Sequence, residues 1–318
     1  MTLGNPDHPV GGLAVPRPPG VELHPLGRDD FADALAMARE LYGLDPDAAA
    51  QPHRAAFEAL VSDVDATSFL AVADGLAAGL IIHRLRRRLN HATFEGWISD
   101  LVVREGFRGR GIGRSLVSAA IAEWRLRGGH VLELEVAYDR TAARALYESL
   151  GFVDQGKYFE VGPVRTRDLA PVAGLEIRPI AAEDFDAVTR LLAELGRPAP
   201  TEERLPALRR TFLHHLARAD TGSLLALLDG APVGFVSLEL RQPFFTLAPQ
   251  AWIPDLIVTD AARGRHVGAA LLDAAFAEAQ ERGAYALALE SGHHRAVAHQ
   301  LYLAAGMSDV GSFFTLAR

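Results

Sequence analysis

Residues 97–113 read Trp-Ile-Ser-Asp-Leu-Val-Val-Arg-Glu-Gly-Phe-Arg-Gly-Arg-Gly-Ile-Gly, and this stretch decides the fold. Its first seven residues are mostly apolar, which predicts a strand over 97–103. A glycine-rich turn follows at 108–113 and leads into an amphipathic helix. Glycines there let the backbone approach a ligand, and the free amides of the helix N-terminus attract an anion such as a pyrophosphate. Three nearby arginines add positive charge: Arg108, Arg110 and Arg114.

The same stretch occurs a second time along the chain. Trp97 and Trp252 each open a Trp-Ile-x-Asp-Leu segment, and 155 positions separate them. The same interval separates Asp74-Gly75 from Asp229-Gly230, Arg108-Gly109-Arg110 from Arg263-Gly264-Arg265, Leu146-Tyr147 from Leu301-Tyr302, and Gly151 from Gly306. Nearer the start, Pro25 and Phe31 pair with Pro179 and Phe185 at an interval of 154. Chance does not keep one spacing across such unlike residue types, so the chain contains a duplicated domain.

The duplication predicts two domains of ordinary size. We expect a flexible tail over 1–20, a first domain over 21–163, a linker over 164–174 and a second domain over 175–318. Helices and strands alternate in each copy, which predicts a mixed sheet of the α/β class. In the first copy the pattern predicts helices at 31–42 and 141–150, and one after the glycine-rich turn that carries Leu116 to Trp124 on its apolar face and ends at Gly128. It also predicts a hairpin of 69–73 and 79–85 around Asp74-Gly75, and strands at 97–103, at 131–136 and near Tyr158.

Two other phosphate-binding loops do not fit the glycine-rich turn. A Walker A loop needs Lys followed by Ser or Thr after its glycines, and Ile112-Gly113 does not supply them. A dinucleotide-binding fingerprint needs a third Gly or Ala where Arg114 stands. Neither an ATPase nor a dinucleotide-dependent dehydrogenase is therefore indicated.

The turn and a later motif together resemble the GNAT superfamily of acetyl-CoA-dependent acyltransferases. Arg108, Gly111 and Gly113 match its Gln/Arg-x-x-Gly-x-Gly/Ala phosphate loop, and residues 146–152 match its Leu-Tyr-x-x-x-Gly-Phe run. Residues 134–147 are especially similar to the ribosomal-protein alanine acetyltransferases. The resemblance covers nearly the whole chain, once per copy. It implies two tandem acyltransferase folds, each with a mixed, mostly antiparallel sheet flanked by helices, and an N-acetyltransferase that uses acetyl-CoA and no metal.

The resemblance also implies where acetyl-CoA binds. In the family two neighbouring strands part to admit the pantetheine arm, and a backbone amide there stabilises the oxyanion. The implied residues are Leu101, Val102, Val103, Arg108, Gly109, Arg110, Gly111, Ile112, Gly113 and Arg114 in the first copy, and Ile257, Val258, Arg263, Gly264, Arg265 and Gly268 in the second.

Amine acetylation needs a base for the ammonium and an acid for the departing thiolate. Tyr147 matches the general-acid tyrosine of the family, and a core aromatic is the alternative role. Glu135 lies twelve residues earlier, where the alanine acetyltransferases have their base, and it shares one strand face with Glu133. A solvated carboxylate pair is the alternative reading. Asp100, a carboxylate in an apolar strand, is the other candidate base.

The second copy keeps Glu290 and Tyr302 at the same spacing as Glu135 and Tyr147. His266 replaces the glycine equivalent to Gly111, and its side chain would crowd a pyrophosphate if that position needs glycine. Two further differences from the family are Met307 after Gly306, and Arg140 and Arg295 where the family often has Asn. Two hypotheses follow: the second copy is an active enzyme, or it is a degenerate acetyl-CoA-binding or scaffold domain.

Composition limits the partners. A formal charge of −8 argues against a general nucleic-acid binder, and the absence of cysteine excludes an acyl-cysteine intermediate. We expect a cytoplasmic protein, since residues 1–20 lack the apolar segment of a signal peptide and no apolar run is long enough for a membrane helix. The histidine pairs 214–215 and 293–294 lack a carboxylate-histidine motif, so we expect no metal site. The resemblance implies a small-molecule or peptide amine as the acceptor, and we expect a monomer or homodimer.

Overall fold

The computed structural model describes all residues except 1–14, 16, 46–48, 90, 92 and 168. The first copy contains β1 (Val21–Pro25), α1 (Phe31–Tyr42), α2 (Gln51–Ser62), β2 (Phe69–Ala73), β3 (Leu76–Arg86), β4 (Glu95–Val103), α3 (Ile112–Leu126), β5 (Val131–Ala137), α4 (Thr141–Ser149) and β6 (Val153–Val161). The predicted helices and strands of this copy are confirmed, with ends that differ by a few residues.

The second copy repeats this order with one additional break. It contains β7 (Leu175–Pro179), α5 (Phe185–Glu194), α6 (Leu205–Ala217), β8 (Leu224–Leu228), β9 (Ala231–Val236), β10 (Glu239–Arg241), β11 (Gln250–Ile253), β12 (Leu256–Val258), α7 (Val267–Glu281), β13 (Ala286–Gly292), α8 (Ala296–Ala304) and β14 (Ser308–Ala317). Short 3₁₀ turns precede α1, α3, α5 and α7. The predicted mixed α/β fold with two similar halves is confirmed.

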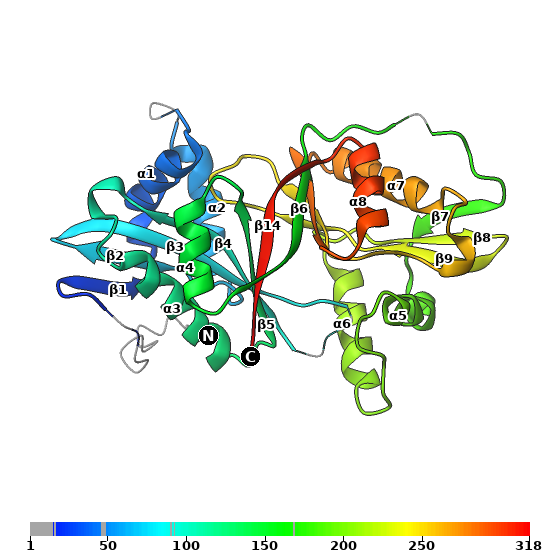
Figure 1. The fold of residues 1–318 in the computed structure, drawn as a ribbon, viewed down its shortest axis with the longest axis horizontal. Coiled ribbons are helices and arrows are strands. Elements are labelled where there is room, and N and C mark those ends of the chain that lie inside the picture. Colours follow the sequence, from blue (N-terminus) through cyan, green and yellow to red (C-terminus); the bar gives the residue numbers. More distant parts are fainter. Residues whose placement is uncertain (1–14, 16, 46–48, 90, 92, 168) are drawn as a thin grey trace.

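A ten-stranded sheet runs through both copies in the order β1-β2-β3-β4-β5-β14-β6-β13-β11-β10. Its strand pairs are antiparallel except β4 with β5 and β11 with β13. Four strands of the second copy form a separate antiparallel sheet in the order β12-β9-β8-β7. The helices of the first copy surround one end of the molecule and those of the second copy the other end (Figure 1).

The last strand of each copy is exchanged between the copies. β14, the end of the second copy, pairs with β5 of the first copy from Gly311 opposite Ala137 to Ala317 opposite Val131. β6, the end of the first copy, pairs with β13 of the second. β6 and β14 also pair with each other, and they lie side by side in the middle of the molecule (Figure 1). Each half of the sheet is therefore completed by a strand from the other repeat.

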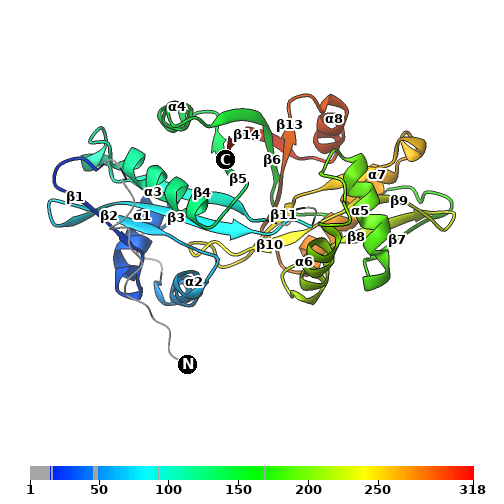
Figure 2. The same cartoon turned by 90° about the horizontal axis from the view of Figure 1, so that it is seen from below.

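Helices cover the sheet on both faces and separate four apolar clusters. In the first copy α3 and α4 cover one face around the fully buried Trp124, while α1 and α2 cover the other around Phe57 (Figure 2). The second copy repeats this with α7 and α8 opposite α5 and α6. Phe244 of the second copy packs into a cluster of the first copy, and Leu89 packs the opposite way. The two copies thus share their cores as well as their sheet.

The central strand of the repeat differs between the copies. In the first copy β4 is continuous, and a register shift opposite Ile82 and His83 accommodates Ser99 as an extra residue. Pro254 stands at the position equivalent to Ser99. Proline has no amide hydrogen to donate to a ladder, so the strand ends at Ile253 and resumes as β12 in the separate sheet.

Residues 164–174 contain no helix or strand among those described, and the segment packs along the second copy. Val164 is buried in the apolar cluster around α7. The Arg167 amide and guanidinium both donate to Asp273, at 2.8 and 3.2 Å. The division into domains at 163 and 175 stays a prediction.

Candidate active site

Two parallel strands part at the centre of the first copy. β4 and β5 pair from Glu95 opposite Val131 to Ile98 opposite Leu134, and their pairing ends there. Leu101, Val102 and Val103 continue to pair with β3 on their other side. Among the described residues the ladder between β4 and β5 does not continue beyond Ile98, so this edge of β4 offers a slot for an extended ligand.

The glycine-rich turn leads directly from this strand into α3. Gly109 and Gly111 have φ values of +76° and +80°, which only glycine adopts readily, and α3 begins at Ile112. Three exposed arginines brace the turn: Arg108 donates to the Val103 carbonyl, Arg110 pairs with Asp74 of the β2–β3 turn at 2.7 Å, and Arg114 donates to Ser149. Together they surround the free amides at the helix start with positive charge.

The second glycine-rich turn has the same backbone path with a different residue at its centre. His266, the residue before α7, has φ +61° and ψ +8°, close to the +80° and +1° of Gly111. The position therefore adopts the left-handed conformation in both copies, and His266 adopts it with a side chain. Gly264 keeps a positive φ of +75°, and Arg263 pairs with Asp260 at 2.7 Å. Arg265 and Gly268 lie on either side of the helix start, and Ile257 and Val258 in β12.

The structure brings Glu135, Tyr147 and Asp100 together where β4 and β5 part. The carboxylate of Glu135 in β5 accepts a 2.7 Å hydrogen bond from the Trp97 indole nitrogen. Tyr147, on α4, is only 6% exposed, and burial together with the charges of Asp100 and Glu135 raises the pKa of its phenol. Asp100 accepts hydrogen bonds from Ser99 and Tyr42, and burial raises the pKa of its carboxyl.

Glu133, on the same face of β5 as Glu135, belongs to a buried ion-pair network. It pairs with Arg86 at 3.2 Å and with Arg88 at 3.1 Å, and both arginines also pair with the fully buried Glu95. Burial and the adjacent Glu95 carboxylate raise the pKa of Glu133 to about 8. The two glutamates are therefore not a solvated pair.

The second copy repeats the constellation with different partners. Glu290 accepts a 2.7 Å hydrogen bond from the Trp252 indole, and burial with the nearby Glu135 carboxylate raises its pKa to about 8. Burial raises the pKa of Tyr302 to about 12. Asp255, equivalent to Asp100, pairs with Arg197 at 2.8 Å rather than with a tyrosine.

A cavity of about 920 Å³ opens between the copies and reaches Glu135 and Asp100. Pseudo-equivalent positions of both copies line it, because it lies where the repeats face each other. They include Asp63 and Arg218, Asp65 and Asp220, Arg84 and Glu239, and Arg86 and Arg241. In the first copy Arg84 pairs with Asp63. At the equivalent positions of the second copy the charges are exchanged, and Glu239 pairs with Arg218.

A much smaller cavity, of about 220 Å³, lies at the equivalent site of the second copy. Its lining includes Glu290 and Tyr302. Arg88 of the first copy and Arg197 line the same space, beside Pro254. The two copies therefore differ in how much room lies next to their candidate base.

Sequence reasoning missed several polar residues of this region. They are Tyr42, Arg86, Arg88, Glu95 and Arg241. A signal was present for two of them, because Arg86 and Arg241 keep the 155-residue interval of the repeat. Among the described residues no group of three or more His, Asp or Glu side chains is placed to hold a metal ion. Nor does the described part of the chain include a helix with the length and apolarity to cross a bilayer.

The comparisons with known proteins agree with this geometry. The model of the acetyltransferase (GNAT) family matches residues 34–152 and 188–307, once in each copy. An aminoalkylphosphonate N-acetyltransferase of Salmonella typhimurium is 33% identical over 156 residues, which are 48% of this chain and 96% of that protein. The ribosomal protein bS18 alanine N-acetyltransferase of the same species is 45% identical over 58 residues, which are 18% of this chain and 39% of that protein.

Among solved structures, a tandem GNAT protein from the clavulanic acid biosynthesis pathway shares the fold. Its TM-score is 0.59 at 18% identity, with 93% of this chain and 98% of that chain covered. The tandem arrangement thus occurs in another protein of the same architecture. Because the family model matches both copies, this chain belongs to the GNAT family of acetyltransferases.

Proposed function

We propose that the first copy transfers the acetyl group of acetyl-CoA to a primary amine by direct attack. The observation that supports this most strongly is the 920 Å³ cavity, which reaches Glu135 and Asp100 of the first copy. The space at the equivalent site of the second copy is about a quarter of that size. An acceptor therefore has room beside only one of the two repeated constellations.

In this proposal the glycine-rich turn and the parted strands of the first copy hold acetyl-CoA. The amides at the start of α3 bind the pyrophosphate, and the residues Leu101 to Val103 bind the pantetheine arm and the acetyl group. An amide of that strand donates to the developing oxyanion. The positive charges of Arg108, Arg110 and Arg114 favour the phosphates. The corresponding residues of the second copy, Ile257, Val258, Arg263, Gly264, Arg265 and Gly268, form the second proposed cofactor site.

Glu135 and Tyr147 supply the proton transfers. Glu135 takes a proton from the acceptor ammonium, and the amine nitrogen then forms its bond to the thioester carbonyl carbon. The carbon–sulfur bond breaks, and Tyr147 gives its phenolic proton to the sulfur. The nitrogen, still positively charged after the attack, returns a proton to the Tyr147 phenolate, and Glu135 releases its proton to solvent, so that an N-acetyl amide and the thiol of CoA leave. The raised pKa of Tyr147 fits this role, because the phenol keeps its proton at neutral pH until a thiolate forms beside it.

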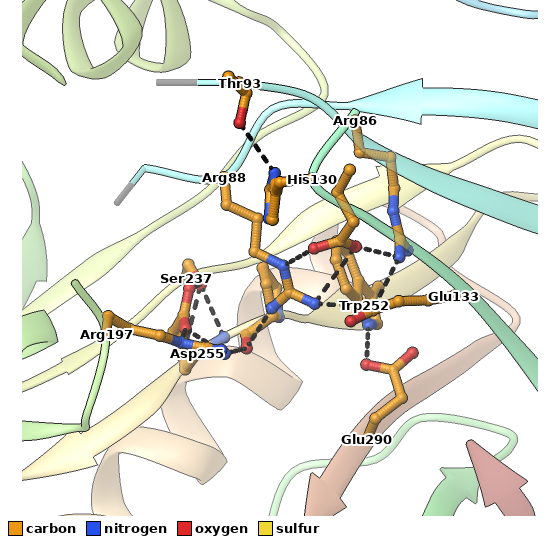
Figure 3. A network of polar contacts seen from close by, with 12 residues as sticks. Arg86, Arg88, Thr93, His130, Glu133, Arg197, Ser237, Trp252, Asp255 and Glu290 are labelled. Carbon is orange, nitrogen blue, oxygen red and sulfur yellow. Dashed lines mark hydrogen bonds and ion pairs between the residues drawn. The ribbon is translucent and has the colours of Figure 1, made fainter. Parts of the chain in front are cut away.

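A network of ion pairs and hydrogen bonds lies beside Trp252, Asp255 and Glu290 of the second copy (Figure 3). Arg88, a residue of the first copy, donates to the Pro254 carbonyl at 3.0 Å and pairs with Glu95 and Glu133. Arg197 donates to Asp255 in the same region. At the repeat positions equivalent to Arg88, Glu95 and Glu133 the chain has Pro243, Gln250 and Ala288.

Pro243 and Gln250, which are uncharged, line the large cavity beside the first copy's site. Arg88 and Glu133 of the ion-pair network line the small cavity beside the second copy's site. We therefore assign transfer to the first copy. The second copy serves as a scaffold or as a site that holds acetyl-CoA without an acceptor, and Glu290 and Tyr302 do not transfer an acetyl group.

Matched variants of the two copies test this proposal. Free CoA release is measured with a panel of primary amines that includes 2-aminoethylphosphonate, amino acids and a peptide N-terminus. Glu135→Gln and Tyr147→Phe are expected to lower kcat by about 100-fold or more, the usual contribution of a general acid or base. Tyr302→Phe, the matched change in the second copy, is expected to leave the rate within about twofold.

Two outcomes would contradict the assignment. Equal losses in Tyr147→Phe and Tyr302→Phe would mean that both copies transfer. An unchanged rate in Glu135→Gln together with a large loss in Asp100→Asn would move the base to Asp100. Calorimetric titration with acetyl-CoA then counts the sites per chain and separates a cofactor-holding second copy from a scaffold.

A further inference from the structure

The two candidate bases of the repeat share one arginine. Arg241, in β10 of the second copy, has one guanidinium nitrogen 3.6 Å from a carboxylate oxygen of Glu135 and the other 3.8 Å from Glu290. Its guanidinium lies over both indoles of the repeat, 4.0 Å from the ring centre of Trp97 and 3.7 Å from that of Trp252. Each indole in turn donates its N–H to one of the two glutamates, at 2.7 Å. We call these five side chains the junction: Arg241, Glu135, Glu290, Trp97 and Trp252.

Within the junction, charge holds Arg241 between the two carboxylates, and its guanidinium stacks on the two indoles. Its side chain is 7% exposed, and its Nε and Nη2 atoms have no hydrogen-bond partner among the described residues. Arg86, at the equivalent position of the first copy, does not take the same role. It lies over the same indoles but pairs with Glu95 and Glu133.

The polar and charged groups that face Glu135 come from five elements. They include the Trp97 indole of β4, the Arg241 guanidinium of β10 and the Glu290 carboxyl of β13. Tyr158 of β6 and Tyr147 of α4 also face it. Glu290 in turn faces Arg86 and Glu133. Two buried carboxyls this close do not both ionise readily, and a cation between them favours the loss of one proton from the pair.

Within the pair, the pKa of Glu290 is raised to about 8, so Glu290 holds a proton at neutral pH. The pKa of Arg241 is lowered by burial and by Arg86, but only to about 10, so it stays charged over the range in which Glu290 titrates.

We propose that Arg241 of the second copy positions Glu135 of the first copy as the base and keeps a negative charge on the buried pair that Glu135 forms with Glu290. The active site then needs both copies, although only one of them transfers. This inference rests on the proposed role of Glu135 as the base. Arg241 acts through Glu135 and is a positioning residue.

The acid limb of the pH–rate profile tests the proposal. Without the charge of Arg241, the buried pair of carboxyls holds its protons more tightly, so less of the base is available at neutral pH. In Arg241→Met the acid limb of kcat/KM for the amine is expected to move up by about one to two pH units, the usual effect of an adjacent opposite charge. The rate at pH 7 falls about tenfold or more and recovers toward pH 9, while the KM for acetyl-CoA is unchanged.

A second substitution separates this role from a structural one. Arg241→Lys keeps the positive charge at this position, so the pair of carboxyls keeps its cation. This variant is expected to show less than half of the shift of the acid limb seen in Arg241→Met. Arg282→Met, which removes another paired arginine of the second copy directly after α7, serves as the control and leaves the limb in place.

A direct titration needs no acceptor and no turnover. Trp97 and Trp252 donate to the two glutamates, so their fluorescence reports ionisation of the pair. A transition near pH 8 is expected in the wild type. The part of this transition that comes from Glu290 is lost in Glu290→Gln. In Arg241→Met the midpoint of the transition moves to higher pH, because the cation that favours the carboxylates is gone.

The outcomes distinguish the proposal from the function on which it rests. An acid limb and a fluorescence transition that stay in place in Arg241→Met would overturn the role of Arg241. A rate loss of the same size at every pH, in Arg241→Lys as in Arg241→Met, would assign Arg241 to packing alone. If no amine releases CoA but the fluorescence transitions move as expected, the proposed function fails and the coupling of the carboxyls stands.

Discussion

At the scale of single residues, the repeat allows one backbone position to be compared with and without a side chain. Gly111 and His266 both precede the first turn of a helix in the left-handed conformation. That conformation costs a residue with a side chain roughly 1–2 kcal/mol, while a glycine adds about 0.4–1 kcal/mol of entropy to the unfolded chain. A Cβ at Gly111 would also lie 3.1 Å from Pro18.

We therefore expect opposite effects from the two exchanges. Gly111→Ala lowers the free energy of unfolding by a few tenths to about 1 kcal/mol, the difference between strain and entropy, and the contact with Pro18 adds to this loss. It also weakens acetyl-CoA binding, because the amides of this turn move. His266→Gly raises the free energy of unfolding by a few tenths to about 1 kcal/mol, the difference between strain and entropy. Urea unfolding measures both, and a stabilised Gly111→Ala variant would contradict this account.

At the scale of elements, the exchanged strands depend on a close backbone approach at Gly156. A Cβ there would collide with the Ser291 carbonyl, with the Phe313 ring and with Gly292 Cα at 2.7 Å. These groups belong to the two strands between which β6 lies. Two of the three are backbone atoms of β13, which cannot turn aside as a flexible side chain does.

Gly156→Ala is therefore expected to lower the free energy of unfolding by about 2–3 kcal/mol, as overpacking of a tight interior does. Gly106→Ala is the matched control, because nothing lies within 4 Å of a Cβ at that position, and we expect a change within about 0.5 kcal/mol. Denaturant unfolding of both variants at one pH gives the comparison. Equal stabilities would show that β6 can shift away from β13 at little cost.

At the scale of the whole molecule, strand exchange makes each copy dependent on the other. Without the second copy, β5 loses β14 and β6 loses both of its neighbours. A single copy would expose unpaired strand edges, which favour association. The shared cores around Phe244 and Leu89 add apolar surface to that exposure.

A chain cut between residues 170 and 171 tests this dependence. The two fragments, produced together with a tag on one, are expected to purify as a one-to-one complex that releases CoA like the intact chain. Each fragment produced alone is expected to aggregate or to form a strand-exchanged dimer. Size-exclusion chromatography with light scattering measures the masses, and a folded monomeric fragment of either kind would contradict the prediction.

Much of this protein was predictable from local patterns in the sequence. The glycine-rich turn between an apolar strand and an amphipathic helix, the Asp-Gly hairpin and the Leu-Tyr motif each depend on neighbouring residues. The 155-residue interval then indicated two copies of one fold. The roles of Glu135, Tyr147 and their repeats stay predictions, although the structure places Glu135, Tyr147 and Asp100 at one site.

The partners of the strands and of the buried charges were decided only in the tertiary structure. An edge strand pairs with any compatible edge, so the sequence of β14 does not say whether it completes its own copy or the other. The position of Arg241 between Glu135 and Glu290 likewise depends on how the two copies face each other. Residue type and periodicity set each element, because those forces act over a few residues, whereas the cavity and the shared arginine arise from contacts between distant parts of the chain.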